Sequence, residues 1–296
     1  MSLACIHTHT FFCDGKDDIE TFCHVAYEKG LDSLGFSAHA PILKKTGFRT
    51  TWHLKDERLE EYLDSVRSAK KRWEGKLPVY LGMEADFIPG LTGPADKEYR
   101  EMCLDFIIAS VHYVVPPMGE PFTVDGPPEE VEQGIKEGFG GDPMGMIESY
   151  FNSEEAMIRT RGFDVLGHPD LVKLHNERNK FFNPQSDYYL KEIAALATLL
   201  AETGAPSEIN TGGINRDKIS ECYPSLDFLK CFRKQNVPIV INADAHRVED
   251  LDGNYEEARK AMLEAGYTET VLFSGKVNGK AVWKNHDLSF HYRKRH

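Results

Sequence analysis

Seven short apolar segments, separated by longer amphipathic ones, limit how this 296-residue chain can fold more than any other feature. Each short segment is rich in β-branched or aromatic residues, as buried parallel strands tend to be. The seven predicted strands cover 3–6, 33–36, 78–82, 105–110, 163–166, 207–209 and 238–241. Helical patterns lie between them at 17–29, 55–74, 143–160, 185–203 and 225–236. This alternation predicts a parallel α/β sheet with right-handed crossovers.

The chain has seven predicted strands, and its composition does not change along its length. Both features favour one closed or nearly closed barrel, and hence a single domain over 1–296. The alternative is an open doubly wound sheet, but no GxGxxG or Walker A motif follows a predicted strand. After the seventh strand we expect a helix at 254–265. A C-terminal hairpin should follow at about 270–283, with its turn at Ser274-Gly275.

Histidine or an acidic residue follows six of the seven predicted strands. Active sites of α/β barrels lie at the carboxyl ends of the strands, so these side chains should converge there. The candidate metal ligands are His7, His9, Asp14, His39, Glu84, His112, His168, Asp244 and His246. A single histidine at a strand end is more often an ordinary core or surface residue, but nine such side chains at equivalent positions indicate a metal site.

Neutral imidazole and carboxylate together are ligands for Zn, Mn or Fe rather than for Ca or Mg. Nine ligands exceed the needs of one ion and suit two or three, with bridging carboxylates. Clustered ions can polarise a phosphoryl oxygen and lower the pKa of a bound water, which favours phosphate-ester hydrolysis. A serine hydrolase site is disfavoured because there is no GxSxG elbow. Cys13 could act as a nucleophile, but no nearby histidine is left as its base.

The net charge of −12 disfavours non-specific binding to nucleic acid or to an anionic membrane, while leaving room for a small anionic ligand. No stretch approaches the length of an apolar membrane span, and residues 1–7 lack the features of a signal peptide. The six cysteines form no CxxC pair. We therefore expect a reduced, cytoplasmic protein. The sequence leaves the oligomeric state open.

Seven short motifs contain the nine candidate ligands. They are His7-Thr8-His9-Thr10, Cys13-Asp14-Gly15, Ser37-Ala38-His39, Gly82-Met83-Glu84, Ser110-Val111-His112, Gly167-His168-Pro169-Asp170 and Asp244-Ala245-His246. Together they resemble the motifs of the PHP (polymerase and histidinol phosphatase) superfamily over about positions 3–265. The resemblance implies a distorted (β/α)7 TIM-like barrel with a trinuclear metal site.

The resemblance also implies how the ligands divide among the ions. His7, His9, Glu84 and Asp244 would hold one ion. Glu84 would bridge to a second ion, which His112 and His168 would also hold. Asp14, His39 and His246 would hold the third ion.

Within the superfamily the chain looks most like the histidinol-phosphate phosphatase branch. Three features carry this resemblance: the segment 208–213 followed by Arg216, the segment Tyr223-Pro224-Ser225, and an insertion at about 115–150 on the substrate side. It implies hydrolysis of L-histidinol phosphate to L-histidinol and phosphate, a step of histidine biosynthesis.

Several further residues are candidates for catalysis or substrate binding. Arg216 should bind a phosphate oxygen, because guanidinium matches phosphate geometry and stays charged. Asp244 or a bound water could protonate the leaving alkoxide. The other candidate substrate-binding residues are Asn210, Lys173, Arg178 and His175, with Lys180 as a further basic group after the fifth strand.

Three alternative functions remain open at this stage. The chain could be a PHP-type phosphoesterase acting on a nucleotide or sugar phosphate, because the metal ligands do not distinguish these substrates. A nucleic-acid-processing module would need a basic groove, which the net charge of −12 disfavours. A non-catalytic metal-binding scaffold would be expected to lack some ligands, and all nine positions are filled.

Overall fold

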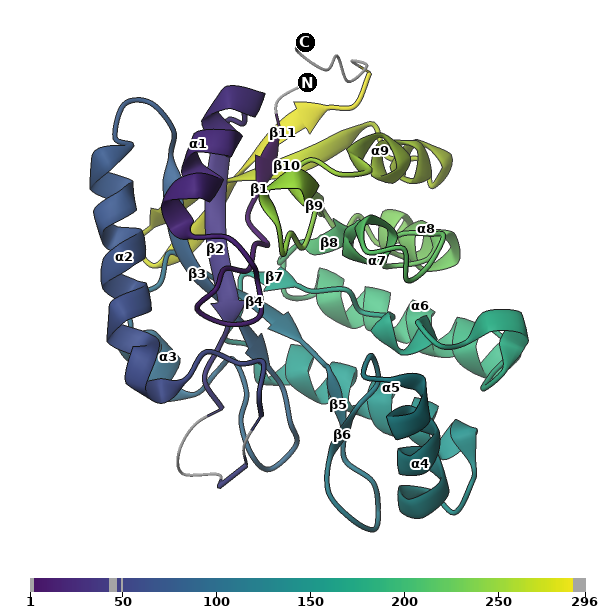
Figure 1. The fold of residues 1–296 in the computed structure, drawn as a ribbon. Helices are drawn as coiled ribbons and strands as arrows, with labels where there is room; N and C mark the ends of the chain where they lie inside the picture. Colours follow the sequence, from purple (N-terminus) through teal and green to yellow (C-terminus); the bar gives the residue numbers. More distant parts are fainter. Residues whose placement is uncertain (1–2, 43–46, 49, 290–296) are drawn as a thin grey trace.

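The computed structural model describes residues 3–42, 47–48 and 50–289. Seven parallel strands form one sheet in the order β1-β2-β3-β4-β7-β8-β9, which follows the order along the chain (Figure 1). The strands are β1 (Ala4–Cys5), β2 (Ser33–His39), β3 (Val79–Asp86), β4 (Phe106–Ser110), β7 (Val165–Leu166), β8 (Ser207–Asn210) and β9 (Ile239–Asn242). All seven predicted strands are confirmed.

The sheet curls until its first and last strands meet. Beyond the ends of β1 and β9, Thr8 and Ala245 form a parallel bridge. The amide of His9 donates to the carbonyl of Ala245 at 2.8 Å, and the amide of Ala245 donates to the carbonyl of His7 at 3.1 Å. The fold is therefore a distorted, nearly closed (β/α)7 barrel, and the open doubly wound alternative is wrong.

Helices surround the barrel, as the amphipathic segments predict (Figure 1). They are α1 (Ile19–Lys29), α2 (Leu59–Arg72), α3 (Lys97–Glu101), α4 (Pro128–Gly138), α5 (Pro143–Thr160), α6 (Asp187–Ala201), α7 (Gly212–Asn215), α8 (Leu226–Lys234) and α9 (Tyr255–Glu264). Their beginnings are encoded locally. Asp18 caps α1 by accepting from the amide of Thr21, and Ser186 caps α6 in the same way from Tyr189. No helix in the described ranges is both long and apolar enough to cross a membrane.

Two strands run three or four residues further than the sequence predicts. β2 continues through His39 and β3 through Asp86, and the ladder between them still pairs His39 with Glu84. The predicted ends at 36 and 82 were placed where the apolar runs stop. Every residue of β2 is buried, polar ones included, because its carboxyl end lies inside the cluster of histidines and acids. Two predicted metal ligands thus sit on rigid strands rather than in loops.

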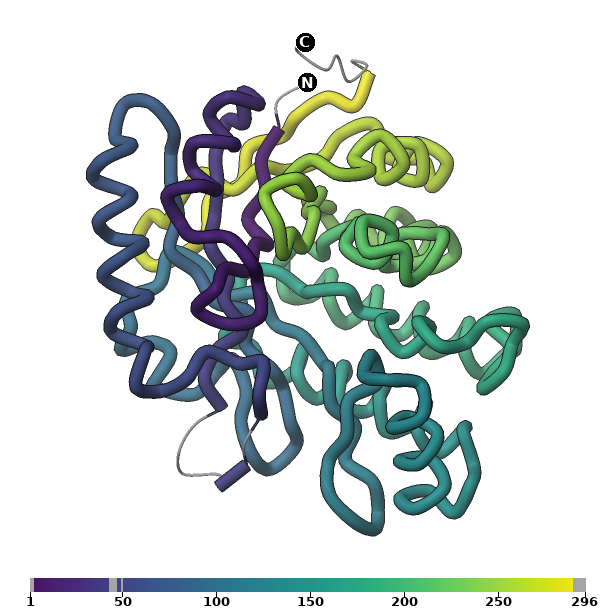
Figure 2. The backbone as a smooth tube through the Cα atoms, in the orientation of Figure 1, coloured from purple at the N-terminus to yellow at the C-terminus, as the bar shows by residue number. Residues whose placement is uncertain are grey.

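The predicted insertion at 115–150 has regular structure of its own. It contains most of a small hairpin formed by β5 (Tyr113–Val114) and β6 (Phe122–Thr123), then α4 and the start of α5. Figure 2 shows this teal segment projecting from the carboxyl-end side of the barrel. The hairpin brings residues just after β6 close to those that follow β4, since the amide of Val124 donates to the carbonyl of His112 at 2.9 Å.

A C-terminal hairpin, β10 (Glu269–Val277) and β11 (Lys280–Asp287), is confirmed, but its predicted turn at Ser274-Gly275 is wrong. The chain turns at Asn278-Gly279, where both residues have positive φ, as a two-residue turn of this kind requires. The pairing register shifts between Phe273 and Lys276 instead. Phe273 and Val271 pack with residues at the amino ends of β4, β7 and β9, so the hairpin covers the end of the barrel opposite the candidate ligands. That the whole chain is one domain stays a prediction.

Candidate metal centre

The structure brings all nine predicted ligands together at the carboxyl end of the barrel. They form four overlapping groups, and within each group the donor atoms lie within 4.8 Å of one another. The groups are His9, Asp14, His39 and His246; His7, Glu84 and His168; His7, His9 and Asp244; and His39, Glu84 and His112. All six cysteines are described and free, and none of them belongs to these groups.

Glu84 is the centre of the cluster, and it is completely buried. Its Oε2 lies 2.8 Å from Nδ1 of His39, 3.3 Å from Nε2 of His7 and 3.5 Å from Nε2 of His9. Its Oε1 lies 2.9 Å from Nε2 of His168 and 3.6 Å from Nε2 of His112. One carboxylate therefore faces five imidazoles, which is the placement that a bridging ligand requires.

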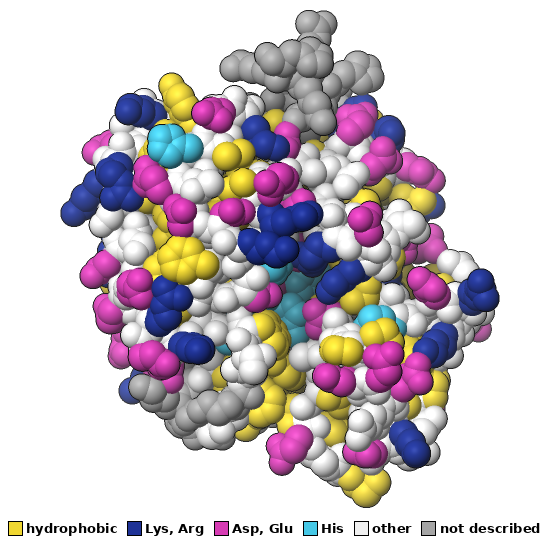
Figure 3. All heavy atoms as spheres, viewed as in Figure 1, with side chains coloured by type: hydrophobic (Ala, Val, Ile, Leu, Met, Phe, Trp, Pro, Cys, Tyr) yellow, Lys and Arg dark blue, Asp and Glu magenta, His cyan; other side chains and the backbone are white. Residues whose placement is uncertain are grey.

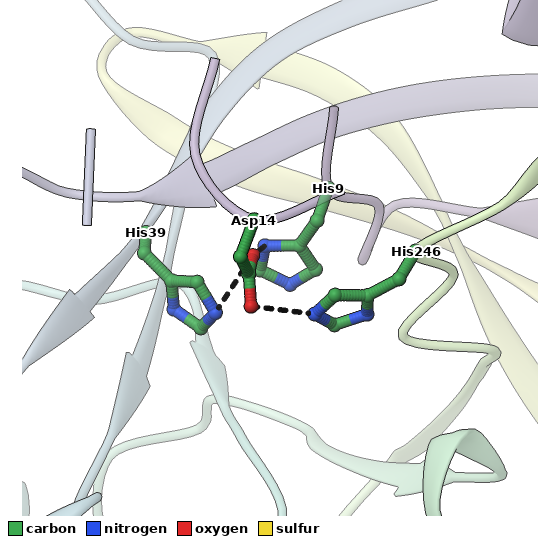
Figure 4. Close-up of side chains that lie close together, drawn as sticks. All are labelled: His9, Asp14, His39 and His246. Atoms are coloured by element: carbon green, nitrogen blue, oxygen red, sulfur yellow. Dashed lines mark hydrogen bonds and ion pairs between the residues drawn. The ribbon is translucent and has the colours of Figure 1, made fainter. Parts of the chain in front are cut away.

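A second centre of donors forms around the more exposed Asp14 (Figure 4). Its Oδ2 lies 3.2 Å from Nε2 of His246, and its Oδ1 lies 3.6 Å from Nε2 of His39. The rings of His39 and His246 both stack on the ring of His9, with centroids 4.2 and 4.3 Å away. Three imidazoles and one carboxylate thus come from three separate segments of the chain.

Asp244 connects the cluster to Arg216. Its Oδ1 lies 3.2 Å from Nε2 of His9, while its Oδ2 accepts from Nη2 of Arg216 at 3.1 Å. Nη1 of Arg216 donates to the Asp244 carbonyl at 3.0 Å. The approach is possible because residue 212 is glycine, since a Cβ there would lie 2.7 Å from the Asp244 Oδ2.

The donor set fits divalent cations. Nε2 of His7 and of His9, Nδ1 of His39 and Oε2 of Glu84 are buried, and they find no hydrogen-bond partner among the described residues. Buried polar atoms without partners are costly in a folded protein. Imidazole nitrogens aimed at one carboxylate oxygen are what an ion with nitrogen and oxygen ligands needs. We conclude that the cluster is a binding site for divalent metal.

The electrostatics of the cluster point the same way. Burial and the neighbouring His39 and His246 lower the pKa of His9 to about 3, so His9 is neutral at pH 7, as a metal ligand must be. Burial also lowers the pKa of His112, but Asp86 and Glu84 outweigh it and raise this pKa to about 10, because the two carboxylates stabilise positive charge at this position. Burial raises the pKa of Asp244, but Arg216 and His7 hold it well below its usual range. A carboxylate that stays ionised is better suited to bind a cation than to donate a proton.

Two buried carboxylates to which the sequence analysis assigns no role, Asp86 and Glu208, contact the ring nitrogens of His112 and His7 that lie away from the cluster. Asp86 lies 2.9 Å from Nδ1 of His112 and 2.7 Å from Nε2 of His53. Glu208 lies 2.9 Å from Nδ1 of His7 and accepts from the amide of His168 at 3.0 Å. The contacts with Nδ1 of His112 and with Nδ1 of His7 hold these two imidazoles with Nε2 directed at the cluster. For Asp86 a signal existed, because residues two apart on a strand point to the same face, as Glu84 and Asp86 do.

Replacing Asp86 by Asn is expected to lower metal affinity about 10–100-fold, because His112 loses the carboxylate that fixes its ring. The measurement is a competition titration with a chromogenic chelator. Asp64→Asn, on the exposed side of α2, is the matched control and should bind metal as the wild type does. Equal affinities for both variants would remove Asp86 from the metal centre.

The cluster opens into a cavity of about 240 Å³. Figure 3 shows histidine side chains at the bottom of a hollow, with Lys and Arg side chains gathered along one side. Six of the nine ligands line this cavity, namely Asp14, His39, His112, His168, Asp244 and His246. Its other lining residues include Trp52, Thr123, Asp125, Leu171, Arg216 and Lys218. Of these, only Arg216 was assigned a role from the sequence.

The remaining predicted substrate-binding residues occupy different surroundings. The side chain of Asn210 is buried against Glu208 and the amide of Gly212. The Lys173 ammonium bonds to the carbonyl of Cys222 and pairs with Asp170 and Glu221. Both side chains contact neighbouring protein groups, and neither is among the described residues that line the cavity.

Two more predicted substrate-binding residues lie in the segment after β7. Arg178 is exposed on the short helix Glu177–Asn179 and is likewise absent from the described cavity lining. His175 lies beside the cavity, with its Nε2 2.7 Å from the carbonyl of Gly126, which lines it. The substrate-binding roles of Asn210, Lys173, Arg178 and His175 stay predictions.

Comparison with known proteins identifies the family of this fold. The model of the PHP domain family matches residues 6–212, which is more than half of the chain. The chain belongs to the PHP family. Among curated PHP relatives, a protein of Deinococcus radiodurans named "Probable histidinol-phosphatase" is 28% identical over 268 residues. The match covers 90% of this chain and 95% of that protein, so it spans nearly the full length of both.

Two solved structures share the PHP barrel. The HisK crystal structure from Listeria monocytogenes superposes with a TM-score of 0.76 and 22% identity, covering 86% of this chain and 98% of that one. Histidinol phosphate phosphatase from Lactococcus lactis, crystallised with zinc, L-histidinol and phosphate, gives a TM-score of 0.64 at 20% identity. That match covers 95% of this chain and 99% of the other. Both likenesses confirm the barrel fold.

Proposed function

We propose that this PHP-family protein is a metal-dependent phosphatase that hydrolyses L-histidinol phosphate to L-histidinol and phosphate, a step of histidine biosynthesis. The observation that carries the proposal is the convergence of nine metal-binding side chains around Glu84, beneath a small cavity that Arg216 lines. The Deinococcus relative supports the substrate, because it matches 90% of this chain and carries the histidinol-phosphatase name. The zinc, L-histidinol and phosphate in the Lactococcus structure support it as well.

We propose that the centre holds two to three divalent ions, of Zn, Mn or Fe. His7, His9, Glu84 and Asp244 would hold one, Glu84 with His112 and His168 a second, and Asp14 with His39 and His246 a third. The close contacts of Glu84 with five histidines support its role as the bridge. When bound, such ions neutralise phosphate charge and activate water.

The protein's own side chains would orient and hold the phosphate. Arg216 has one guanidinium edge fixed on Asp244, while its buried Nε–H has no hydrogen-bond partner among the described residues. A phosphate oxygen in the cavity would satisfy this donor with a charge-assisted hydrogen bond. Lys218, also in the cavity lining, adds a second positive charge. The ionised Asp244 holds both the cation centre and Arg216 in place.

Hydrolysis at phosphorus breaks the bond between phosphorus and the alcohol oxygen, and the alcohol oxygen takes a proton. The oxygen of water stays on phosphate. Turnover of L-histidinol phosphate in ¹⁸O-labelled water should therefore give unlabelled L-histidinol and phosphate with one ¹⁸O, measured by mass spectrometry. Label in L-histidinol would contradict attack at phosphorus, and the absence of turnover by the metal-loaded protein would contradict the proposed function.

Replacing Arg216 by Ala is expected to raise KM for phosphate monoesters about 10–100-fold, because a charge-assisted hydrogen bond to the substrate is lost. Arg216→Lys should recover only part of the loss, since an ammonium is a point donor. Steady-state kinetics with metal content measured in parallel is the test, and Arg159→Ala, on the exposed side of α5, is the control. An unchanged KM in Arg216→Ala would exclude a contact with phosphate.

The working environment of the enzyme is also a proposal. We propose a cytoplasmic enzyme whose partner is a small phosphate ester and which has no nucleic-acid partner. The net charge of −12 and the six free cysteines support this assignment.

A further inference from the structure

The cavity beside the metal centre carries both positive and negative side chains in its lining. Once the predicted metal ligands are set aside, the charged side chains among the described residues of its lining are Arg216, Lys218 and Asp125. Two cations suit a phosphate dianion, but a carboxylate repels it. Asp125 therefore weakens phosphate binding unless it meets a positive charge on the same ligand.

The backbone holds Asp125 firmly in this position from both sides. The preceding residue, Val124, donates its amide to the carbonyl of His112 at 2.9 Å. The carbonyl of the following residue, Gly126, lies 2.7 Å from Nε2 of His175 and accepts a hydrogen bond from it. A side chain at 126 would crowd Thr123, because a Cβ there would lie 2.5 Å from its Oγ1. His175 thus acts through Gly126 as a positioning residue.

The carboxylate of Asp125 has no partner among the residues that the structure describes. It forms no hydrogen bond or ion pair with the residues that the structure describes, and it belongs to none of the metal-ligand groups found among them. Asp125 shares the cavity lining with Arg216 and with His112.

We propose that Asp125 binds the ammonium group of the substrate, so that the site selects phosphate monoesters of amino alcohols over neutral alkyl phosphates. This inference rests on the proposed function, because phosphate bound at the metal centre and Arg216 directs the other end of the ligand toward the remaining cavity wall. The cavity has a volume of about 240 Å³, which suits a small ester of this kind. Trp52 adds an aromatic wall, with its ring 4.5 Å from that of His39.

The test compares esters with and without an ammonium group. Asp125→Asn should lower kcat/KM for L-histidinol phosphate and for O-phosphoethanolamine about 10–100-fold, as expected when a charged hydrogen bond is lost. For ethyl phosphate and propyl phosphate, kcat/KM should stay unchanged or rise. Binding of L-histidinol, measured by calorimetry, should weaken in parallel. Glu120→Gln, exposed in the same segment, is the matched control and should leave all these values unchanged.

An equal loss for both classes of ester, or a loss of bound metal in Asp125→Asn, would show a general structural role and overturn the inference. No change for either class would overturn it as well. Failure of the proposed function looks different, because the wild-type protein itself would then not release phosphate from L-histidinol phosphate. If the wild type cleaves all four esters with similar kcat/KM, it is a phosphatase without the selectivity that we assign to Asp125.

Discussion

Replacing Glu84 by Gln is expected to reduce phosphate release by more than about 100-fold. This exceeds the loss typical of replacing a residue that only supports a metal ligand. Glutamine keeps the shape of the side chain but removes its negative charge. It also replaces one carboxylate oxygen by an NH2 group, which donates hydrogen bonds and cannot bind a metal ion. The carboxylate of Glu84 lies 2.8–3.6 Å from ring nitrogens of five histidines, so the loss of its charge affects all five contacts. Because it is completely buried, no water can substitute for the lost oxygen.

The measurement for Glu84→Gln is steady-state kinetics together with elemental analysis of the purified protein. Both activity and bound metal should fall, while circular dichroism should show an intact barrel. Glu60→Gln, on the helix α2, provides a variant of identical chemistry on an exposed surface. Wild-type metal content and turnover in Glu84→Gln would mean that Glu84 is not the bridge.

Removal of the metal by a chelator is expected to abolish turnover and to lower the thermal midpoint. The metal-free cluster places three carboxylates among six histidines, and ions that bind only the folded state stabilise it. In the metal-free protein, burial lowers the pKa of His112, but Asp86 and Glu84 raise it to about 10, so His112 is protonated at pH 7. Adding metal back must displace this proton.

The chelation experiment therefore has two independent readouts. Return of Zn, Mn or Fe should restore activity, and weakly buffered solution should acidify as the metal binds. Calorimetry in buffers of different ionisation enthalpy measures the number of protons released. Full activity in protein shown by elemental analysis to be metal-free would refute a metal-dependent reaction.

Much of this fold can be predicted from the sequence because its signals are local. Short apolar runs mark the barrel strands, and Asp18 and Ser186 mark where α1 and α6 begin. Predictions failed where tertiary contacts decide the outcome. β2 and β3 run on into polar residues because the cluster of histidines and acids surrounds them. The misplaced final turn is an error of another kind, because Asn278-Gly279 is itself a local signal for a two-residue turn with positive φ.

The same contrast holds for the site. The nine ligand positions carry short motifs, and the structure brings all of them together. The supporting residues have no such motif. His53 was given no role, yet it is buried against Asp86, and Glu208 comes from the one barrel strand without a predicted ligand. Lys173 shows what a position in the sequence leaves out: it follows the fifth predicted strand, but its contacts with Asp170, Cys222 and Glu221 are visible only in the fold, and its substrate-binding role stays a prediction.

This barrel is proposed to be a metal-dependent phosphatase selective for L-histidinol phosphate. The most direct test is kcat/KM of the metal-loaded protein for L-histidinol phosphate, measured beside a nucleoside monophosphate and a sugar phosphate under identical conditions. We expect a preference for L-histidinol phosphate of more than about 100-fold, since a site built for a polar group rejects ligands that lack it. Equal values for the three esters, or a higher value for the nucleotide or sugar phosphate, would contradict it.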